Sequence, residues 1–346
     1  MAERRARVER LLQAARRLAD AQTAEGRRLR ERLHETSGLS NANIELGLTR
    51  CLETSPSSSE LDELLASTPE APRAHVLLAG NVFVAALRAA AIGVASSARV
   101  AVRASRRDPA LIEALHELAP GSFELTRALS PAPGDHVWSY GSDSTLAELR
   151  ASLPRGVWFH AHGSGFGAVA VDARSWSPDD ARAIALDTAL FDRRGCLSPR
   201  VVCVAGSHPQ ARAVAEQLAG ALGELERELP SGPQSPAEAA ELRRQRDAAT
   251  YAFELFEAGS AWVSLSSALA VGGGGRSLHV LPASDVAASL APWAAQLTCV
   301  SSNDLELRRQ LSAALPGARL ARLGEMQRPA LDGPVDRRHP PHGELV

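Results

Sequence analysis

The spacing of apolar residues predicts that the chain opens with amphipathic helices. In the first twenty residues, apolar side chains recur every three or four positions, which is the period of one face of an α-helix. These positions are Val8, Leu11, Leu12, Ala15, Leu18 and Ala19. The helical pattern continues to about Glu53, and residues 54–72 form a polar connector around a short helix.

From residue 75 onward, short apolar runs alternate with helical patterns. The first group of predicted strands comprises residues 75–79, 98–103, 135–140, 156–162 and 167–172. The pattern repeats after Cys196, with further strands at residues 200–206, 261–266, 277–282 and 297–302. Strands that are apolar along nearly their whole length and alternate with helices indicate parallel sheets covered on both faces. The sequence therefore predicts an α/β fold with two parallel-sheet lobes that meet near residue 160.

Composition is that of an ordinary globular protein. The 346 residues are 45% hydrophobic and 23% charged, with a formal net charge of −2. This balance gives no reason to expect nucleic acid or an anionic membrane as a partner. No apolar run reaches the ~18 residues that a membrane span needs, and the first twenty residues are too charged for a secretory signal. We therefore expect a cytoplasmic protein.

One of the four cysteines lies in a polar loop. Positions 51, 196, 203 and 299 fit neither a disulfide framework nor a zinc spacing, so we expect no metal site. Cys203 lies in an apolar run, whereas Cys196 lies in the sequence RRGCLSP, where Arg193 and Arg194 would favour the reactive thiolate. The residues alone leave two interpretations of Cys196 open. It is either a small buried hydrophobe or a nucleophile for an acyl carbonyl.

A second loop, VGGGGRS at residues 271–277, is rich in glycine. Such a run can cradle a phosphate. It lacks the strand-to-helix context and the Lys-Ser/Thr pair of a P-loop, so a flexible turn between strands is favoured.

Four segments of the chain, in this order, carry a resemblance to a known family. They are the strand–helix–strand–turn segment 80–109, the turn YGSDST at 140–145, the segment HGSGFGAVAVDA at 162–173 and the loop RRGCLSPRVVCV at 193–204. Together they resemble the aldehyde dehydrogenase superfamily, and more closely its luminescence-type (Lux) branch of acyl-CoA reductases. The tail from Gly324, with its Pro-x-Asp motif, is similar to the ending typical of that branch.

The resemblance implies a domain organisation. It predicts an aldehyde-dehydrogenase-like α/β fold with two Rossmann-like parallel-sheet lobes and N-terminal helices. Residues 1–160 would form the N-terminal helices and a cofactor-binding domain, residues 161–325 a catalytic domain with the nucleophile loop, and residues 326–346 a C-terminal tail.

The resemblance also assigns the acyl chemistry. Cys196 matches the family's nucleophile, and Asn81 matches the asparagine that, with the cysteine's own backbone N–H, stabilises negative charge on the acyl oxygen. From the residues alone, Asn81 is also a candidate N-cap of a helix over residues 82–97, and both roles can hold. Phe83 stands where the reductase branch commonly has proline.

The cofactor assignment depends on the turn after the second strand. Arg103 and Ser105 match family residues that contact the adenosine ribose, and Arg106 stands where a glutamate holds the ribose 2′-hydroxyl. A guanidinium in place of that carboxylate favours a 2′-phosphate, so we predict NADPH, with NADH as the alternative. Gly141 and Ser142 would let the backbone approach the cofactor and cap its helix. A solvated arginine cluster is the plain alternative.

His162 occupies the position at which aldehyde-oxidising members have their water-activating glutamate. Loss of that carboxylate points toward formation of aldehyde rather than acid. His162 could transfer a proton, or could be a hydrogen-bonded structural residue. Gly163 beside it suits a tight turn near cofactor or substrate.

These assignments predict NADPH-dependent reduction of an acyl thioester, carried by CoA or a carrier protein, to an aldehyde through an acyl-Cys196 intermediate. Two other readings stay open: an aldehyde dehydrogenase that produces acid, and a non-catalytic paralogue that acts as a binding or assembly subunit. The acyl chain length, the thiol carrier and homo-oligomer formation are not fixed by the residues.

Overall fold

Two mainly parallel β-sheets organise the chain, and each lies in a separate unit. The computed structural model describes residues 1–272, 274–340 and 342–346, so Gly273 of the glycine-rich loop and Pro341 of the tail lie outside the described residues. Unit 1 comprises Met1–Ser37, Ile44–Ser164 and Ala330–Val346. Unit 2 comprises Gly38–Asn43 and Gly165–Pro329.

The sheet of unit 1 has the order β13-β5-β4-β1-β2-β3. Its strands are β1 (Ala74–Leu77), β2 (Val100–Arg103), β3 (Glu124–Leu125), β4 (His136–Tyr140), β5 (Trp158–His162) and β13 (Glu344–Leu345). The five strands β1 to β5 pair in parallel, and β13 pairs antiparallel with β5. Parallel pairing places the carboxyl ends of β1, β2, β4 and β5 at one edge of the sheet.

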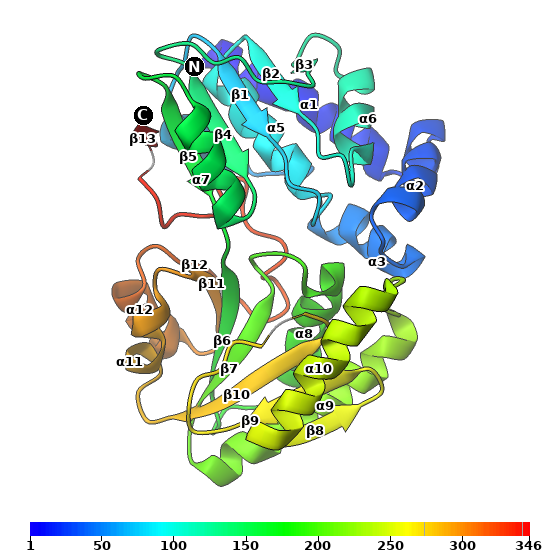
Figure 1. Ribbon diagram of the computed structural model, residues 1–346, viewed down its shortest axis with the longest axis vertical. Coiled ribbons are helices and arrows are strands. Elements are labelled where there is room, and N and C mark those ends of the chain that lie inside the picture. The colour runs from blue at the N-terminus through cyan, green and yellow to red at the C-terminus, as the bar shows by residue number, and fades with distance from the viewer. Residues whose placement is uncertain (273, 341) are drawn as a thin grey trace. The chain divides into compact units, whose positions relative to one another are not determined.

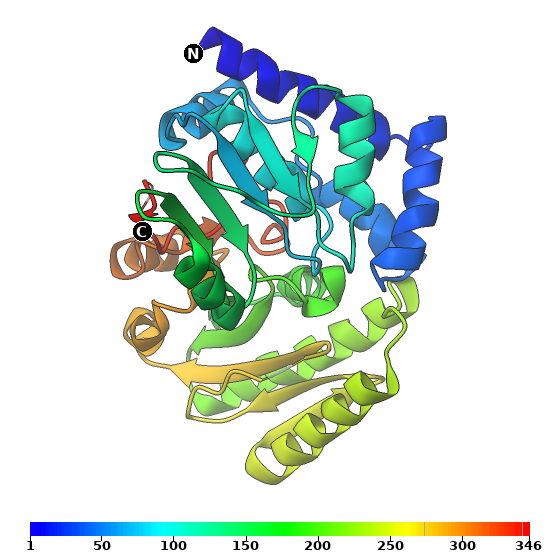
Figure 2. The ribbon, with the colours of Figure 1, turned by 45° about the horizontal axis from the view of Figure 1, so that its top comes forward.

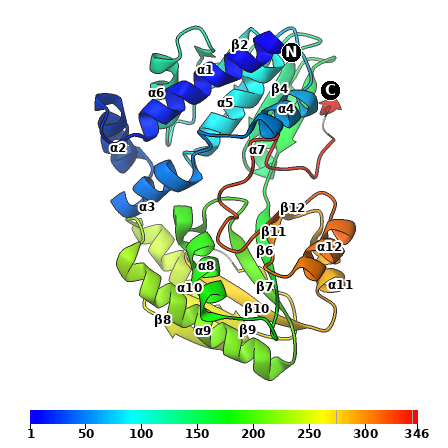
Figure 3. The same cartoon turned by 180° about the vertical axis from the view of Figure 1, so that it is seen from behind.

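Helices cover both faces of this sheet. The helices in this part of the chain are α1 (Ala2–Ala19), α2 (Ala24–Thr36), α3 (Asn41–Leu46), the π-helical turn η1 (Gly47–Cys51), α4 (Ser58–Ser67), α5 (Ala85–Ser96), α6 (Ala110–Leu118) and α7 (Asp143–Ser152). Of these, α3 begins in the segment Gly38–Asn43 of unit 2. Helix α7 lies in front of β4 and β5 in Figure 1, and α1, α4 and α5 lie on the side seen in Figure 3. A Cβ at Gly93 of α5 would lie 3.0 Å from both Val76 and Val100, so this helix packs closely on β1 and β2.

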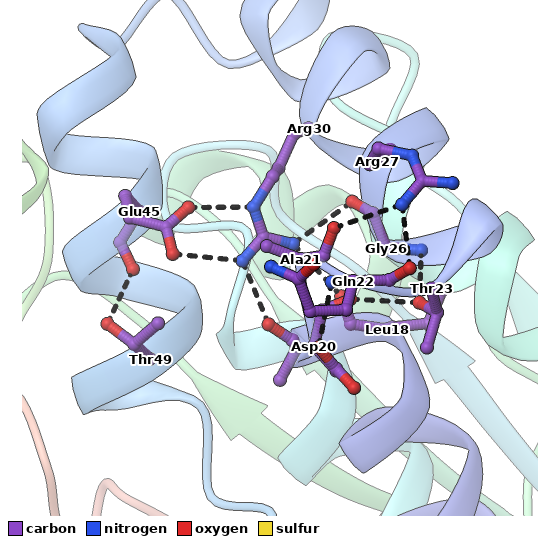
Figure 4. Close-up of polar contacts among 11 residues, drawn as sticks. Leu18, Asp20, Ala21, Gln22, Thr23, Gly26, Arg27, Arg30, Glu45 and Thr49 are labelled. Atoms are coloured by element: carbon purple, nitrogen blue, oxygen red, sulfur yellow. Dashed lines mark hydrogen bonds and ion pairs between the residues drawn. The ribbon is translucent and has the colours of Figure 1, made fainter.

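A half-buried arginine links the helices α2 and α3 (Figure 4). Arg30 of α2 donates Nε and Nη2 to the Glu45 carboxylate of α3, at 2.7 and 3.0 Å, and also bonds the carbonyls of Ala19 and Gly26. This fork-shaped pairing uses the planar guanidinium geometry and holds the pKa of Glu45 below its usual value. Thr23 caps α2 by accepting from the Gly26 N–H at 2.9 Å, which fixes where the second helix begins.

The sheet of unit 2 has the order β12-β11-β6-β7-β10-β9-β8. Its strands are β6 (Phe166–Asp172), β7 (Pro199–Ala205), β8 (Glu254–Ala258), β9 (Ala261–Leu265), β10 (Ser277–Ala283), β11 (Leu297–Ser301) and β12 (Arg319–Ala321). All neighbours are parallel except β8, which forms an antiparallel hairpin with β9. Figures 1 and 2 show β8, β9 and β10 as its yellow-to-orange strands.

The helices of unit 2 sandwich this sheet. They are α8 (Pro178–Ala189), the 3₁₀ turn η2 (Leu190–Arg193), α9 (His208–Glu228), α10 (Pro236–Ala252), α11 (Val286–Leu290), the 3₁₀ turn η3 (Ala291–Trp293) and α12 (Leu305–Ala314). Helix α9 packs against α8 and against β8, β9 and β10. On the other face, α11 and α12 share a buried apolar cluster with β6, β7 and β10. No described helix is long and apolar enough to cross a bilayer.

The α/β fold predicted from the sequence, with N-terminal helices and two parallel-sheet lobes, is confirmed. The strands β3, β8, β12 and β13 were not predicted. They are short or partly exposed edge strands, so they lack the continuous apolar runs by which the inner strands were recognised.

The C-terminal tail is fastened to unit 1 by a buried arginine. Arg88 of α5 is 3% exposed. It donates to the Glu53 carboxylate at 2.7 Å and to the carbonyls of Ala330 and Gly333 in the tail. Arg88 thus holds the start of the tail, which ends as β13 on the edge of the sheet.

We expect Arg88→Met to destabilise unit 1 by about 3 kcal/mol, because it leaves the Glu53 carboxylate and two buried carbonyls without their cation. Thermal unfolding measures the loss, and limited proteolysis within residues 330–346 should become faster. Arg150→Met is the matched control, since Arg150 pairs with Glu344 of the same tail at the surface. It should cost less than about 1 kcal/mol. Equal losses in the two variants would contradict this account.

Candidate active site

The predicted residues of unit 1 lie along the carboxyl edge of its sheet. The chain leaves β1 through Leu78, whose N–H donates to the Arg103 carbonyl at the end of β2. A Cβ at Gly80 would lie 2.3 Å from the Ser105 Oγ, so the two turns can approach only because residue 80 is glycine. Asn81 follows directly and is exposed. This places Asn81 beside the turn that carries Arg103, Ser105 and Arg106.

One alternative role of Asn81 is wrong. Helix α5 begins at Ala85, and its N-cap is Val84, which makes no side-chain capping bond. Residues 82–84 are not helical, because the chain makes an extra turn there before the helix starts. Asn81 is therefore not the N-cap of this helix.

The arginines after β2 present free cationic groups. Arg106 is exposed and Arg103 is half-buried at the strand end. Within the part of the chain that the structure describes, neither guanidinium has a hydrogen bond or an ion pair. Ser105 accepts the Arg107 N–H at 3.2 Å, which shapes the turn. The edge thus offers two cations that no protein carboxylate neutralises.

The ends of β4 and β5 form a second close approach. The Gly141 N–H donates to the His162 carbonyl at 3.2 Å, and Ser142 caps α7 by accepting from the Thr145 N–H. Asp143 accepts the Ser164 N–H at 2.8 Å, and a Cβ at Gly163 would lie 2.3 Å from that carboxylate. Glycine at 163 is thus required for packing. Asp143 was not recognised from the sequence, where it reads only as part of a polar turn.

His162 lines a cavity of about 200 Å³ within unit 1. The walls come from β5, α4 and the tail, and they include Ser67, Asp332, Asp336, Arg337 and His339. The imidazole stacks on Tyr140 with ring centroids 4.7 Å apart, and it is 8% exposed. Neither ring nitrogen has a hydrogen-bond partner among the described residues. Both ring nitrogens are themselves buried.

Burial keeps this histidine and its neighbours neutral. It lowers the pKa of His162 from 6.5 to about 4, an effect that Asp336 opposes and that His339 and Arg338 reinforce. Burial likewise lowers the pKa of His136 to about 4 and of His160 to about 2. The rings of His136 and His160 are joined by a 2.9 Å hydrogen bond. At neutral pH, the imidazole of His162 is therefore uncharged.

Unit 2 carries the predicted nucleophile. Of the four cysteines, all of which the structure describes, Cys196 alone is not fully buried. Burial raises the pKa of Cys203 to about 12 and also raises that of Cys299, so both are inert thiols. Cys196 precedes β7 in a loop. Its thiol is partly accessible, and its role as a nucleophile stays a prediction.

The turn before Cys196 has an uncommon backbone. Phe191, Asp192 and Arg193 have φ angles of 55°, 49° and 58°. Each non-glycine residue in the left-handed region costs about 1–2 kcal/mol, so three in succession need support from the surrounding structure. The strained segment ends three residues before the sulfur.

The arginines beside Cys196 also contact the main chain. Arg193 is buried and donates to the carbonyls of Gly274 and Ser277, and Arg194 donates to the Gly38 carbonyl. Both guanidiniums therefore hold main-chain oxygens. Burial lowers the pKa of Arg193 to about 9, and the nearby Arg200 adds to this.

Arg200 lies close enough to Cys196 for the charges of the two side chains to interact. Burial lowers its pKa, and Cys196 opposes that shift. Its guanidinium has no hydrogen bond or ion pair to any residue in the described ranges, and its Nε is buried. Sequence analysis missed Arg200 because it directly precedes an apolar run and reads as the first residue of the strand.

The other side of the loop is held by β6 and the end of unit 2. The Gly167 N–H donates to the Ser198 carbonyl at 2.9 Å, and a Cβ at Gly167 would lie 2.5 Å from the Leu197 oxygen. Gln327 donates Nε2 to the Ser198 Oγ and to the Asp187 carbonyl, both at 3.1 Å. These contacts leave the segment after Cys196 little freedom.

Comparison with known proteins identifies the family of this chain. The sequence model of the family described as acyl-CoA reductase (LuxC) matches residues 119–336, which is more than half of the chain. The chain belongs to the LuxC family of acyl-CoA reductases. It is therefore an oxidoreductase, and the resemblance to the Lux branch of the aldehyde dehydrogenase superfamily is confirmed. No curated protein sequence matches this LuxC-family chain.

Solved structures share its fold. Lactaldehyde dehydrogenase from Escherichia coli superposes with a TM-score of 0.63 at 14% identity, covering 92% of this chain and 78% of that one. An aldehyde dehydrogenase from Brucella melitensis biovar abortus 2308 gives 0.67 at 14% identity, with coverages of 93% and 77%. The NADP-dependent glyceraldehyde-3-phosphate dehydrogenase from Bacillus halodurans C-125, solved with NADP, superposes with a TM-score of 0.61 at 16% identity. The superposition covers 91% of this chain and 77% of that one. The LuxC-family chain therefore has the aldehyde dehydrogenase fold.

We expect the stability of the protein to fall as the pH drops from about 6.5 toward 4. A histidine whose pKa is about 4 when folded and 6.5 when unfolded stabilises the fold above pH 6.5, and this contribution is lost as the unfolded chain takes up the proton. For His162 alone the loss is on the order of 3 kcal/mol. His162→Phe keeps the stacking on Tyr140 and should flatten the dependence of the melting temperature on pH.

His208→Phe is the control, because His208 is exposed at the start of α9 in unit 2. It should leave the slope between pH 6.5 and 4 as in the unmodified protein. The same slope in both variants would show that His162 is not the buried neutral histidine described above.

Proposed function

We propose that the protein reduces acyl thioesters to aldehydes with NADPH, through a thioester on Cys196. The observation that carries the proposal is the Cys196 loop in a LuxC-family chain: a partly accessible thiol that interacts with an otherwise unpaired arginine. The substrate is an acyl-CoA or an acyl-carrier thioester. A thioester carbonyl is electrophilic enough for attack by a thiolate without prior activation by phosphate.

The chain's own residues supply the acyl transfer. The Cys196 thiolate attacks the thioester carbonyl, the bond to the CoA sulfur breaks, and the leaving thiolate takes up a proton. The positive charge of Arg200 favours the ionised form of Cys196. The backbone N–H of Cys196 would stabilise the oxyanion, a contribution worth about 3 kcal/mol for a single donor.

The edge of the unit 1 sheet fits a dinucleotide. Arg103 and Arg106 are cations without partners among the described residues, and Ser105 shapes the turn that carries them. Gly141, Ser142 and Gly163 belong to the glycine-containing turns by the start of α7. When bound, the cofactor supplies the hydride that releases the acyl group as an aldehyde. The free guanidinium of Arg106 favours the 2′-phosphate of NADPH over the 2′-hydroxyl of NADH.

His162 supports the reductive direction. His162 stands where aldehyde-oxidising members have the carboxylate that activates water. Burial lowers its pKa to about 4, so the imidazole is neutral and a weak base at working pH, and hydrolysis of the acyl-enzyme to acid is disfavoured.

We expect the protein to be acylated on Cys196 when it is incubated with octanoyl-CoA in the absence of a reductant. Intact and peptide mass spectrometry measure the adduct, and release of free CoA measures its rate. Cys196→Ala should form no adduct and lose aldehyde production. Cys203→Ala is the control, because its buried thiol has a pKa of about 12 and should take no part. An unacylated Cys196 would refute the proposal, and free acid as the main product would favour the oxidative reading.

We expect Arg106→Glu to shift the ratio of kcat/KM for NADPH over NADH toward NADH by at least about tenfold, because a carboxylate repels the 2′-phosphate and accepts the 2′-hydroxyl. Steady-state kinetics with both cofactors measures the ratio. Arg10→Glu makes the same change of charge at an exposed position of α1, and it should leave the ratio unchanged. If the Arg106 variant behaves like the Arg10 variant, the assignment of NADPH through Arg106 fails.

A further inference from the structure

A buried asparagine far away in the sequence holds the left-handed turn before Cys196. Asn43 belongs to the segment Gly38–Asn43, which packs within unit 2, and its side chain is completely buried. Its Oδ1 accepts the Phe191 N–H at 2.8 Å, and its Nδ2 donates to the Ala189 carbonyl at 3.0 Å. One amide group therefore bridges the end of α8 and the first residue of the turn.

This bridge gives two main-chain groups a side-chain partner at the point where the helical pairing ends. Helix α8 ends at Ala189, and Phe191 already has a φ of 55°, so the regular helical pairing stops there. Phe191 is fully buried, so water has little access to its N–H. Only a side chain with both a donor and an acceptor can serve the two groups, and an amide has both.

Two further contacts hold the next residues of the turn. Asp192 accepts from Arg276 at 2.9 Å and from the Gly232 N–H at 3.0 Å. Arg193 donates to the carbonyls on either side of Arg276, as described above. The turn is thus held from three directions, and Asn43 acts at the residue where the left-handed conformation begins.

We propose that Asn43 is a positioning residue for Cys196. Asn43 fixes the conformation of the Phe191–Arg193 turn, and this conformation determines the position of the Cys196 sulfur in the loop. The proposal rests on Cys196 being the acyl acceptor. It extends the catalytic machinery to a residue of the N-terminal helical region, more than 140 positions before the nucleophile.

The test compares variants of the full chain that change the amide by single atoms. Asn43→Asp keeps the shape and the acceptor but removes the donor, and sets a carboxylate oxygen against the Ala189 carbonyl. Asn43→Ser keeps a smaller donor and acceptor. Leu222→Ala is the control for lost stability, because Leu222 is buried in α9 and makes none of the contacts of the turn.

Peptide mass spectrometry measures the rates of two reactions of the Cys196 thiol. The first is alkylation by iodoacetamide between pH 6 and 10, and the second is acylation by octanoyl-CoA. We expect Asn43→Asp to slow acylation by about 10²-fold, since a displacement of about 1 Å has an effect of that size. The loss should fall on kcat more than on KM. Asn43→Ser should recover part of the rate, and the alkylation profile should change with both variants.

The proposal is overturned if both Asn43 variants react at the rates of Leu222→Ala at a similar loss of melting temperature. If neither variant folds, hydrogen exchange in the unmodified protein decides: slow exchange of the Phe191 amide supports the bridge and fast exchange refutes it. Alkylation needs no acyl substrate, so it tests Asn43 even if octanoyl-CoA fails to acylate Cys196. That failure would count against the proposed function alone.

Discussion

The left-handed turn at Phe191–Arg193 is the constraint on which the nucleophile loop depends. Three consecutive residues with positive φ cannot persist by local preference, because each is less stable there than in a right-handed or extended conformation. Their conformation is fixed by buried partners: the amide of Asn43, the Asp192–Arg276 pair and the carbonyls that Arg193 holds. The strain is thus stored beside the one cysteine with an accessible thiol, and the rest of unit 2 supports it.

Arginine performs the cross-linking throughout this chain, which contains no lysine. Arg88 ties the tail to the core of unit 1, and Arg193 and Arg276 tie the nucleophile loop to the glycine-rich loop and to the end of α9. A guanidinium has five donors in a fixed plane, so it can satisfy several carbonyls at once. These three are engaged with the main chain, whereas Arg103, Arg106 and Arg200 have no hydrogen bond or ion pair among the residues that the structure describes, so their charge is available to an anion.

Parallel pairing explains why the remaining candidates lie together within unit 1. The carboxyl ends of β1, β2, β4 and β5 face the same edge, so residues from four separate parts of the sequence line it. Close approach between neighbouring turns needs glycine at positions 80 and 163, where any side chain would overlap Ser105 or Asp143. The edge is therefore both crowded with turns and supplied with free cationic groups.

The alternation of apolar strands and helices determined the α/β class, the inner strands and the N-terminal helices, because burial on both faces leaves a signal within each segment. Short motifs in order were enough to indicate the family and to single out Cys196. The tertiary structure alone decided that Arg193 serves carbonyls while Arg200 interacts with the sulfur, that His162 faces a cavity beside the tail, and that Asn43 holds the turn. Each of these depends on a partner or an orientation that no local pattern encodes. Asn43 and Phe191, 148 positions apart, meet only once the chain has folded.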